Sequence, residues 1–492
     1  MKKKWSTLFY VLIVAGLGAV IYWIIKQGSA LQGPALNAQE IQTTKDTTAN
    51  GSFHVFSDSF NHNLSEPLAV LLLQIIVIIV FARIFGHIFK KIGQPAVIGE
   101  IVAGIILGPS IMGLFFPHIN HFIFPATSLG TLQFLSQIGL ILFMFIIGME
   151  LDLKAISKQA YGAVIISHAS IIIPYTFGMG LAYFIYNEYA PAGISFSSFA
   201  VFIGIAMSIT AFPVLARILQ EKGLTRSKLG VLALTCAAAD DITAWCILAA
   251  VIALAKSGSS VSALYTIALA VGYVLIMLKL VHPLLEKLGN VYTSKEKMRT
   301  PVIAMLFVIL IVSSYITSII GIHALFGAFT AGVIMPSDFS FRKIVIDKIE
   351  DISIVLLLPI FFVITGLRTQ IGLLNEGHLW VTFGWILLVA VSGKFGGSAF
   401  AARMVGQSWK DSLSIGVLMN TRGLMQLIVL NIGYDLGILS PKIFAMMVLM
   451  ALVTTFMTGP ALDLINWFIP DNSAKHEITT IMDADPENQK VL

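Results

Sequence analysis

The chain has 492 residues, of which 57% are hydrophobic and only 12% are charged, about half the charged fraction of a soluble domain. This composition excludes a soluble globular protein. It predicts a polytopic membrane protein, whose organisation is described by its membrane-spanning segments. The net charge of +5 is explained by Lys and Arg in cytoplasmic loops, so it does not indicate a nucleic-acid partner.

The N-terminal segment begins with three lysines, 2–4, and continues as an uncharged apolar run over 5–25. A basic start is typical of a signal peptide, but this run is longer than a usual signal core. We therefore interpret residues 1–27 as a signal-anchor or a signal peptide. The Asn-, Ser-, Thr- and Gln-rich stretch 28–66 predicts a poorly ordered extracytoplasmic linker.

The rest of the chain, 67–470, contains about thirteen apolar runs that are long enough to cross a bilayer. Lys and Arg concentrate in every second loop, and the positive-inside rule places these loops in the cytoplasm. We predict an all-α polytopic domain of about thirteen transmembrane helices in the plasma (inner) membrane, followed by a short cytoplasmic tail, 471–492. The runs lie near 67–86, 95–115, 127–149, 161–186, 195–217, 229–255, 262–284, 301–319, 322–336, 351–367, 379–402, 412–433 and 441–468. The basic loops are 87–94, 150–160, 218–228, 285–300, 337–350 and 403–411.

Two halves of this domain repeat each other weakly but in the same order. Residues 95–106 resemble 323–334, with Ala-Gly at matching positions, and 142–151 resemble 359–368. In the predicted topology the matched spans run in opposite directions. The repeats, about 95–255 and 322–468, are therefore inverted, an arrangement typical of secondary transporters whose site lies between broken helices.

A third match joins 216–232 to 402–418 at a constant offset. This offset places Gln426 at the position of Asp240, so the second repeat lacks the carboxylate. One ion site is therefore expected, and not two. Helix-breaking residues in the two repeats predict the crossing of two broken helices. These residues are Ser208, Thr210 and Pro213 in the first repeat and Gly393, Gly396 and Gly397 in the second.

The most informative residues are two adjacent acids, Asp240 and Asp241, in the otherwise uncharged run 229–255. A carboxylate at the bilayer centre costs at least ~2.5–3.5 kcal/mol by insertion scales, and each of two neighbours resists ionisation of the other. Such a pair indicates a site that a cation visits. Lys394 is the only lysine deep in a span, and it falls in the predicted second break.

The charges predict the chemistry of the site. Two carboxylates and one lysine leave room for one Na⁺, K⁺ or H⁺ equivalent. A proton and a hard monovalent cation then compete for the same oxygens, and competition at a site that alternates between two faces is antiport. This needs no covalent step, cofactor or nucleotide, so we predict a transporter and not an enzyme.

Three segments carry a resemblance to a known family: 99–110, 211–219 and 420–431. Over about 65–470 the chain resembles the monovalent cation:proton antiporter superfamily, in the branch of the plant cation/H⁺ exchangers and the bacterial Kef-type and Nap-type antiporters. The resemblance implies that Asp241 is the ion-binding acid. An Asp rather than an Asn at position 240, with Lys394 as its partner, implies electrogenic exchange.

The same resemblance implies a homodimer in which a six-helix core domain moves like an elevator against a dimerisation domain. The chain departs from the Kef pattern because the tail after 470 is too short for a nucleotide-binding domain. We therefore expect Na⁺ or K⁺, H⁺, the lipid bilayer and a second copy of the chain as its partners. Glutathione or nucleotide gating is not expected.

Several alternatives stay open at the level of sequence. Lys394 is either a proton carrier or a structural clamp on Asp240. Arg422, with Gln426, either lines the ion path or is structural, and Glu100 is either a gate or a solvated helix start. For the function itself, the alternatives are Na⁺/H⁺ exchange, Kef-type K⁺/H⁺ exchange and a cation channel, although no repeated carbonyl filter of a channel is visible.

Overall fold

The computed structural model of the chain describes residues 15–24, 26–27, 49–150, 160–224, 227–257, 260–292, 300–336 and 338–469. Every element in these ranges is a helix, as the composition predicts. The predicted tail, 471–492, lies outside the described residues.

The chain divides into two units, Met1–Val70 and Leu71–Leu492. In the first unit, a short apolar helix covers Ala15–Ile24, within the predicted signal or anchor. Within the predicted linker, the structure describes one helix, α3 (Ala49–Leu64). Phe56 and Phe60 stack one turn apart in α3, with ring centroids 6.0 Å apart, and such pairs support a helix.

In the second unit, each predicted apolar run is occupied by helix. Eleven helical spans are long and apolar enough to cross a membrane, and two shorter apolar helices, α11 and α17, occupy the other two runs. The first half of the domain consists of α4 (Pro67–Lys91), α5 (Ala96–Leu107), α6 (Met112–Phe115), α7 (Pro117–Ile123), α8 (Ala126–Glu150), α10 (Ala160–Tyr189), α11 (Phe196–Ser208), α12 (Phe212–Glu221) and α13 (Lys228–Ser257).

A connecting span then leads to the second half of the domain. It consists of α14 (Ser260–Ile276), the π-helical η1 (Met277–Val281) and α15 (His282–Tyr292). The second half consists of α16 (Thr300–Ile320), α17 (Ala324–Val333), α18 (Phe339–Asp351), η2 (Ile352–Leu357), α19 (Leu358–Arg368), η3 (Ile371–Leu373), α20 (Gly377–Val391), η4 (Ser392–Gly396), α21 (Gly397–Met404), α22 (Trp409–Met419), α23 (Leu424–Asp435) and α24 (Pro441–Phe468).

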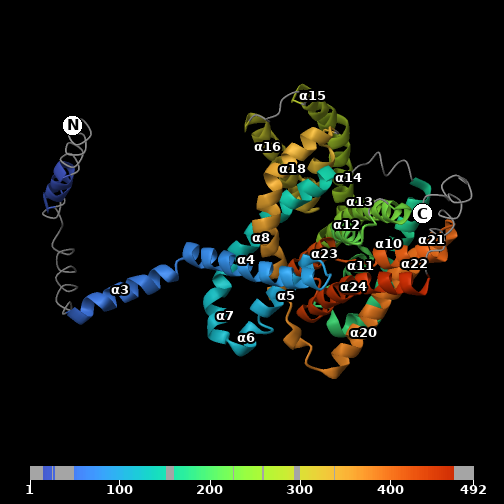
Figure 1. Cartoon of the computed structure of the whole chain (residues 1–492), viewed down its shortest axis with the longest axis horizontal. Coiled ribbons are helices and arrows are strands. Elements are labelled where there is room, and N and C mark those ends of the chain that lie inside the picture. The colour runs from blue at the N-terminus through green and yellow to red at the C-terminus, as the bar shows by residue number, and fades with distance from the viewer. Residues whose placement is uncertain are drawn as a thin grey trace, which may run out of the picture. The chain divides into compact units, whose positions relative to one another are not determined.

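These helices pack in two groups. We call the first the paired bundle: α5 packs on α19, α8 packs on α17 and α19, and α16 packs on α17. The second, the crossing bundle, consists of α10–α13 and α20–α24, which pack on one another. Figure 1 shows the green helices α11–α13 beside the orange and red helices α22–α24 of the other half.

The inverted repeat is visible in two close helix contacts of the paired bundle. A Cβ on Gly104 of α5 would lie 2.9 Å from the Cα of Gly366 in α19, and a Cβ on Gly148 of α8 would lie 2.9 Å from the Cα of Gly332 in α17. The sequence repeat matches Gly104 with Gly332 and, with one extra residue in the second copy, Gly148 with Gly366. The two crossings are therefore the same contact made twice, and only glycine allows this approach of two backbones.

We expect Gly148→Ala to lower the free energy of unfolding by about 1–3 kcal/mol, as for an overpacked core. The melting temperature of the detergent-solubilised protein should fall with it. Gly180→Ala on α10 is the matched control, because nothing lies within 4 Å of a Cβ at that position. Ala is the better helix former, so the control should be as stable as the parent or more so. A Gly148→Ala protein that melts at the parent temperature in size-exclusion thermal shift would contradict the close crossing.

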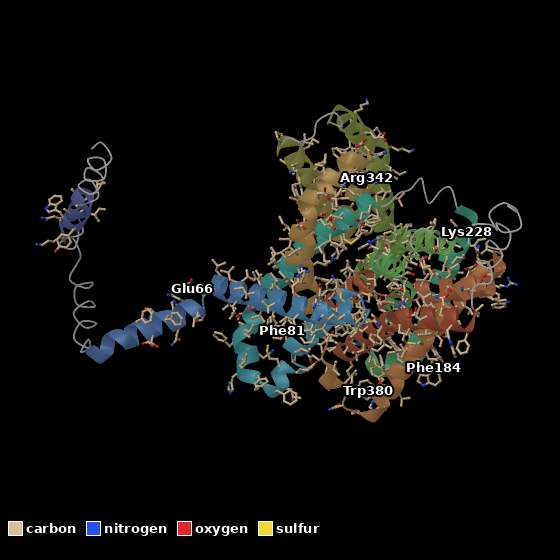
Figure 2. All side chains as sticks on the ribbon, viewed as in Figure 1. Glu66, Phe81, Phe184, Lys228, Arg342 and Trp380 are labelled. Carbon is tan, nitrogen blue, oxygen red and sulfur yellow. The ribbon has the colours of Figure 1, made fainter. Side chains whose placement is uncertain are left out.

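Basic and aromatic side chains mark opposite ends of the helices. Figure 2 shows Lys228 and Arg342 at the end opposite to Phe184 and Trp380. The Arg342 guanidinium donates to the carbonyl oxygens of Met149 at 2.6 Å and of residues 335–336 at 2.8–3.0 Å, which joins the ends of α8 and α17. Phe184 and Trp380 are exposed, as expected of aromatic residues near a membrane interface.

Candidate functional site

Two interrupted helices cross in the crossing bundle. The chain leaves the helix between α11 and α12 and again between α22 and α23. The two extended segments contact each other directly, because Ala211 N donates to Thr421 O at 3.0 Å and Thr210 Oγ1 donates to Met419 O at 3.2 Å. Each break therefore satisfies backbone groups that the other leaves free.

The first break lies where the sequence predicts it, at Ser208–Pro213, but the predicted second break is wrong. Residues 393–396 belong to a π-helical turn, η4, in an uninterrupted helix from α20 to α21. Its glycines serve packing instead: a Cβ on Gly393 would lie 3.0 Å from the Cα of Pro174, and one on Gly397 would lie 3.1 Å from Ile173. Gly396 has open space around it.

The third sequence match, which joins 216–232 to 402–418, is also wrong, because it pairs helices that are not structural counterparts. The interrupted pair α22–α23 is the counterpart of α11–α12, so α24 is the counterpart of α13. The packing agrees, because α13 packs on α10 and α11 as α24 packs on α20 and α22. Gln426 therefore does not take the place of Asp240. Short matches of Ala, Arg, Gly, Val and Leu carry too little information to set a register in apolar sequence.

Asp240 is fully buried and fully hydrogen-bonded. Its Oδ1 accepts from Ser167 Oγ at 2.6 Å, and its Oδ2 accepts from Ser170 Oγ at 2.6 Å and from Thr210 Oγ1 at 2.7 Å. Lys394 Nζ lies 3.0 Å from the same Oδ2. These short bonds are in the range of charge-assisted hydrogen bonds to a carboxylate.

Lys394 has acceptors besides Asp240. It donates to Ser170 O at 2.8 Å, to Ser170 Oγ at 3.2 Å and to Ser208 O, the last carbonyl of α11. The lysine is 0% exposed. A cation at this point neutralises the partial negative charge at the C-terminal end of a helix. Packing of η4 through Gly393 on α10 brings the ammonium group to this place.

Asp241 is in the opposite situation. It is 1% exposed, and neither of its oxygens has a hydrogen-bond partner among the described residues. Four residues further along α13, Trp245 is buried and stacks on Phe329 of α17, with ring centroids 6.0 Å apart. A buried carboxylate without a donor is costly, so the site is suited to a proton or a small cation.

Arg422 lies in the second break and is 1% exposed. Its guanidinium donates to Ala206 O at 3.0 Å and to Met207 O at 2.8 Å, at the C-terminal end of α11. It also donates to Gln426 Oε1 at 3.2 Å, while Thr455 Oγ1 donates to its carbonyl oxygen at 2.5 Å. Arg422 thus supports the helix end that Lys394 also caps, and Gln426 accepts one of its hydrogen bonds.

Glu100 is not part of this constellation. It lies on α5 next to Gly86 of α4, since a Cβ added to Gly86 would lie 3.9 Å from Glu100 Cγ. The Glu100 residue is 8% exposed. The sequence reasoning also missed two residues of the site, Ser167 and Ser170. Two serines three residues apart in an apolar span share one helix face, and this spacing was the available signal.

Comparisons with known proteins identify the family. A family model described as "Sodium/hydrogen exchanger, transmembrane" matches residues 76–465. The chain is 42% identical over 397 residues to the Na(+)/H(+) antiporter NhaS4 of Synechocystis sp., covering 80% of this chain and 97% of that protein.

Longer relatives are matched over part of their length. The chain is 38% identical to Cation/H(+) antiporter 17 of Arabidopsis thaliana, over 85% of this chain and 51% of that protein. It is 36% identical to K(+)/H(+) antiporter 1 of Saccharomyces cerevisiae, over 82% of this chain and 47% of that protein. The chain thus spans about half the length of these two relatives.

A solved structure shows the same fold. The sodium proton antiporter MjNhaP1 from Methanocaldococcus jannaschii superimposes with a TM-score of 0.61 at 16% identity, covering 82% of this chain and 97% of that one. Together with the eleven apolar spans, these matches show a multi-pass integral membrane transporter and not an enzyme. The chain belongs to the sodium/hydrogen exchanger family, in the monovalent cation:proton antiporter superfamily that its sequence resembles.

Proposed function

We propose that the chain is a secondary active antiporter that exchanges Na⁺, or K⁺, for H⁺ by alternating access. The observation that carries the proposal is Asp241, a buried carboxylate whose two oxygens have no donor among the described residues. A bound proton or a bound cation relieves the same desolvation cost. The two ions therefore exclude each other at one site, and this mutual exclusion is the basis of exchange.

Asp240 and Lys394 supply the second charge of the proposed cycle. Lys394 can part from Asp240 and keep Ser170 O and Ser208 O as acceptors, while Asp240 keeps the hydroxyls of Ser167, Ser170 and Thr210 as donors. Neither group is then left without a partner. This favours Lys394 as a mobile proton carrier over a fixed clamp, and with it an electrogenic cycle.

Sodium is the first candidate for the cation. A relative named as a Na(+)/H(+) antiporter matches over nearly its whole length, whereas the relative named as a K(+)/H(+) antiporter matches over about half of its length. A Kef-type exchange of K⁺ for H⁺ is the second candidate. We further propose that the active form is a homodimer in the plasma membrane, as the family resemblance implies.

Exchange in everted membrane vesicles tests this function. Vesicles that contain the protein are first acidified inside by respiration, and a pH-sensitive dye reports the interior. Addition of Na⁺, K⁺ or Li⁺ is expected to release protons in vesicles with the protein and not in vesicles without it. The assay covers about pH 6 to pH 9, a range on both sides of neutral pH. If no cation moves protons at any pH in this range, the proposal is wrong.

A further inference from the structure

A polar network joins the two bundles at one end of the domain. Arg368, the last residue of α19, lies 3.0 Å from Asp435 Oδ1 at the end of α23, and it donates to Asn431 Oδ1 at 2.8 Å. Gln133 of α8 donates to the other oxygen of Asp435 at 3.1 Å. Asn431 Nδ2 in turn donates to Thr365 Oγ1 of α19 at 2.9 Å.

These contacts connect helices that otherwise belong to different groups. α8 and α19 are part of the paired bundle, and α23 is the second half of an interrupted helix in the crossing bundle. Arg368 also lies over the ring of Tyr434, 5.5 Å from its centroid. Movement of the crossing bundle against the paired bundle at this end must therefore break an ion pair, three amide hydrogen bonds and a cation–π contact.

The network covers a small cavity of about 30 Å³, room for a water molecule. Polar residues of both bundles line the cavity, among them Gln133, Ser136, Asn431 and Asp435. Apolar residues, among them Leu325 and Ile428, complete its lining. The cavity therefore has a polar part, which the network forms, and an apolar part, which we call its floor.

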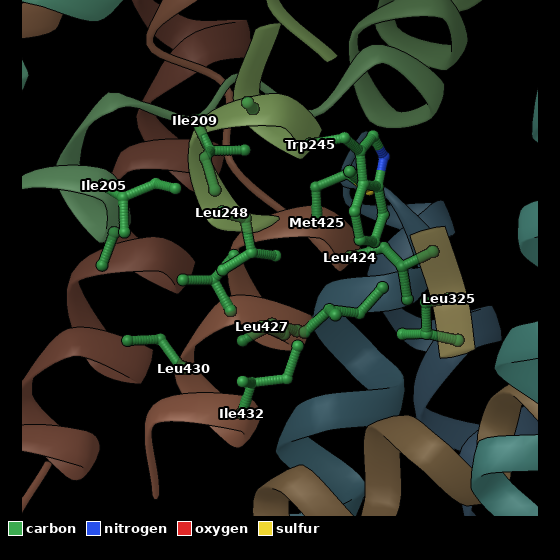
Figure 3. Close-up of a cluster of buried hydrophobic side chains, with 14 of the residues drawn as sticks. Ile205, Ile209, Trp245, Leu248, Leu325, Leu424, Met425, Leu427, Leu430 and Ile432 are labelled. Atoms are coloured by element: carbon green, nitrogen blue, oxygen red, sulfur yellow. The ribbon is translucent and has the colours of Figure 1, made fainter. Parts of the chain in front are cut away.

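An apolar plug continues from this floor toward the ion site. Leu325 of α17 and Leu424 and Met425 of α23 are buried in one cluster with Trp245, and Figure 3 shows them together. Trp245 lies four residues after Asp241 on α13, about 6 Å along the helix. Through Leu325, which lines the cavity, the plug connects the network with Trp245, one turn from Asp241.

We propose that Arg368, Asp435, Asn431 and Gln133 form a latch that holds the ion site closed on the extracytoplasmic side and opens in each transport cycle. The side follows from the positive-inside rule, which places the loops after α19 and α23 outside. Arg368 is 18% exposed and Asp435 is 37% exposed. A pair in partial contact with water is weak enough to break and re-form. The latch rests on the proposed alternating access.

Accessibility of a cysteine in the covered cavity tests the latch. The reporter is Ser136→Cys in the full chain, in which Cys236→Ala and Cys246→Ser remove the native thiols. Outside-out vesicles are treated with membrane-impermeant thiol reagents, one cationic and one anionic. We expect slow labelling of the parent and labelling that is several-fold faster with both reagents after Arg368→Gln or Asp435→Asn. A change in local charge alone would move the two reagents in opposite directions.

Two further variants make the test specific. The swap of Arg368→Asp with Asp435→Arg should restore slow labelling, because the ion pair is rebuilt. Asp463→Asn is the matched control: it breaks the Lys222–Asp463 pair, 2.6 Å long, which joins α12 and α24 within the crossing bundle, and labelling should stay at the parent rate. Equal rates in the parent and in both neutral latch variants would refute the latch, as would equal acceleration by Asp463→Asn.

Exchange by the same proteins in everted vesicles separates the two proposals. If the parent exchanges cations for protons but the latch variants label at the parent rate, the latch fails and the proposed function stands. If the parent does not exchange, the proposed function fails whatever the labelling shows. Gln133→Ala, which removes one hydrogen bond and no charge, should give a smaller acceleration than Asp435→Asn.

Discussion

Asp241→Asn is expected to abolish cation-induced proton release in everted vesicles, down to the level of vesicles without the protein. Asn has the same shape, but it can neither take up a proton at neutral pH nor offer a full negative charge to a cation. Both oxygens of Asp241 lack a hydrogen-bond partner among the described residues. The substitution therefore breaks no described bond, and a loss of transport cannot be ascribed to a lost contact.

The thermal stability of the Asp241→Asn protein provides the control. Removal of a buried, unpaired charge should leave the melting temperature unchanged or raise it. Asp463→Asn, a neutralised acid in a surface ion pair, should retain full exchange. Wild-type exchange by Asp241→Asn at any cation concentration would remove this residue from the transport site and with it the core of the proposed function.

Asp240→Asn is expected to have a different signature, because Asp240 has a partner. The change leaves the Lys394 ammonium buried without its counter-charge, and breaking such a pair costs about 3–5 kcal/mol. We therefore expect a clearly lower melting temperature, with exchange that is electroneutral or lost. Currents on a solid-supported membrane, compared with proton release from the same protein, measure the charge moved per cycle.

The double variant Asp240→Asn with Lys394→Gln resolves the role of the pair. Removal of both charges should recover most of the stability, since a neutral pair carries no uncompensated buried charge. The Asn oxygen can still accept from the hydroxyls of Ser170 and Thr210, and its amide nitrogen can donate to Ser167 Oγ. We expect exchange through Asp241 with no net charge moved. An undiminished current in the double variant would show that Asp240 and Lys394 do not determine the charge moved in each cycle.

The interrupted helices show where prediction from sequence stops. Ser208–Pro213 could be predicted because a proline, with Ser208 and Thr210 just before it, acts locally on the backbone. The glycines at 393–397 also disfavour a helix locally, yet they lie in an unbroken helix, where Gly393 and Gly397 pack on Pro174 and Ile173 of α10. Whether a glycine breaks a helix or lets a neighbour approach depends on the partner helix, and that partner is distant in sequence.

The sequence by itself determined the class of protein, its apolar spans and the acids on which the proposed function depends. A bilayer requires long apolar helices, and it makes Asp240, Asp241 and Lys394 too costly to be incidental. Only the tertiary structure decided how these charges are divided. It surrounds Asp240 with three hydroxyls and a lysine and leaves Asp241 without a donor among the described residues. Two adjacent aspartates are equivalent in a sequence, but on a helix they point 100° apart, and the neighbouring helices set what each one meets.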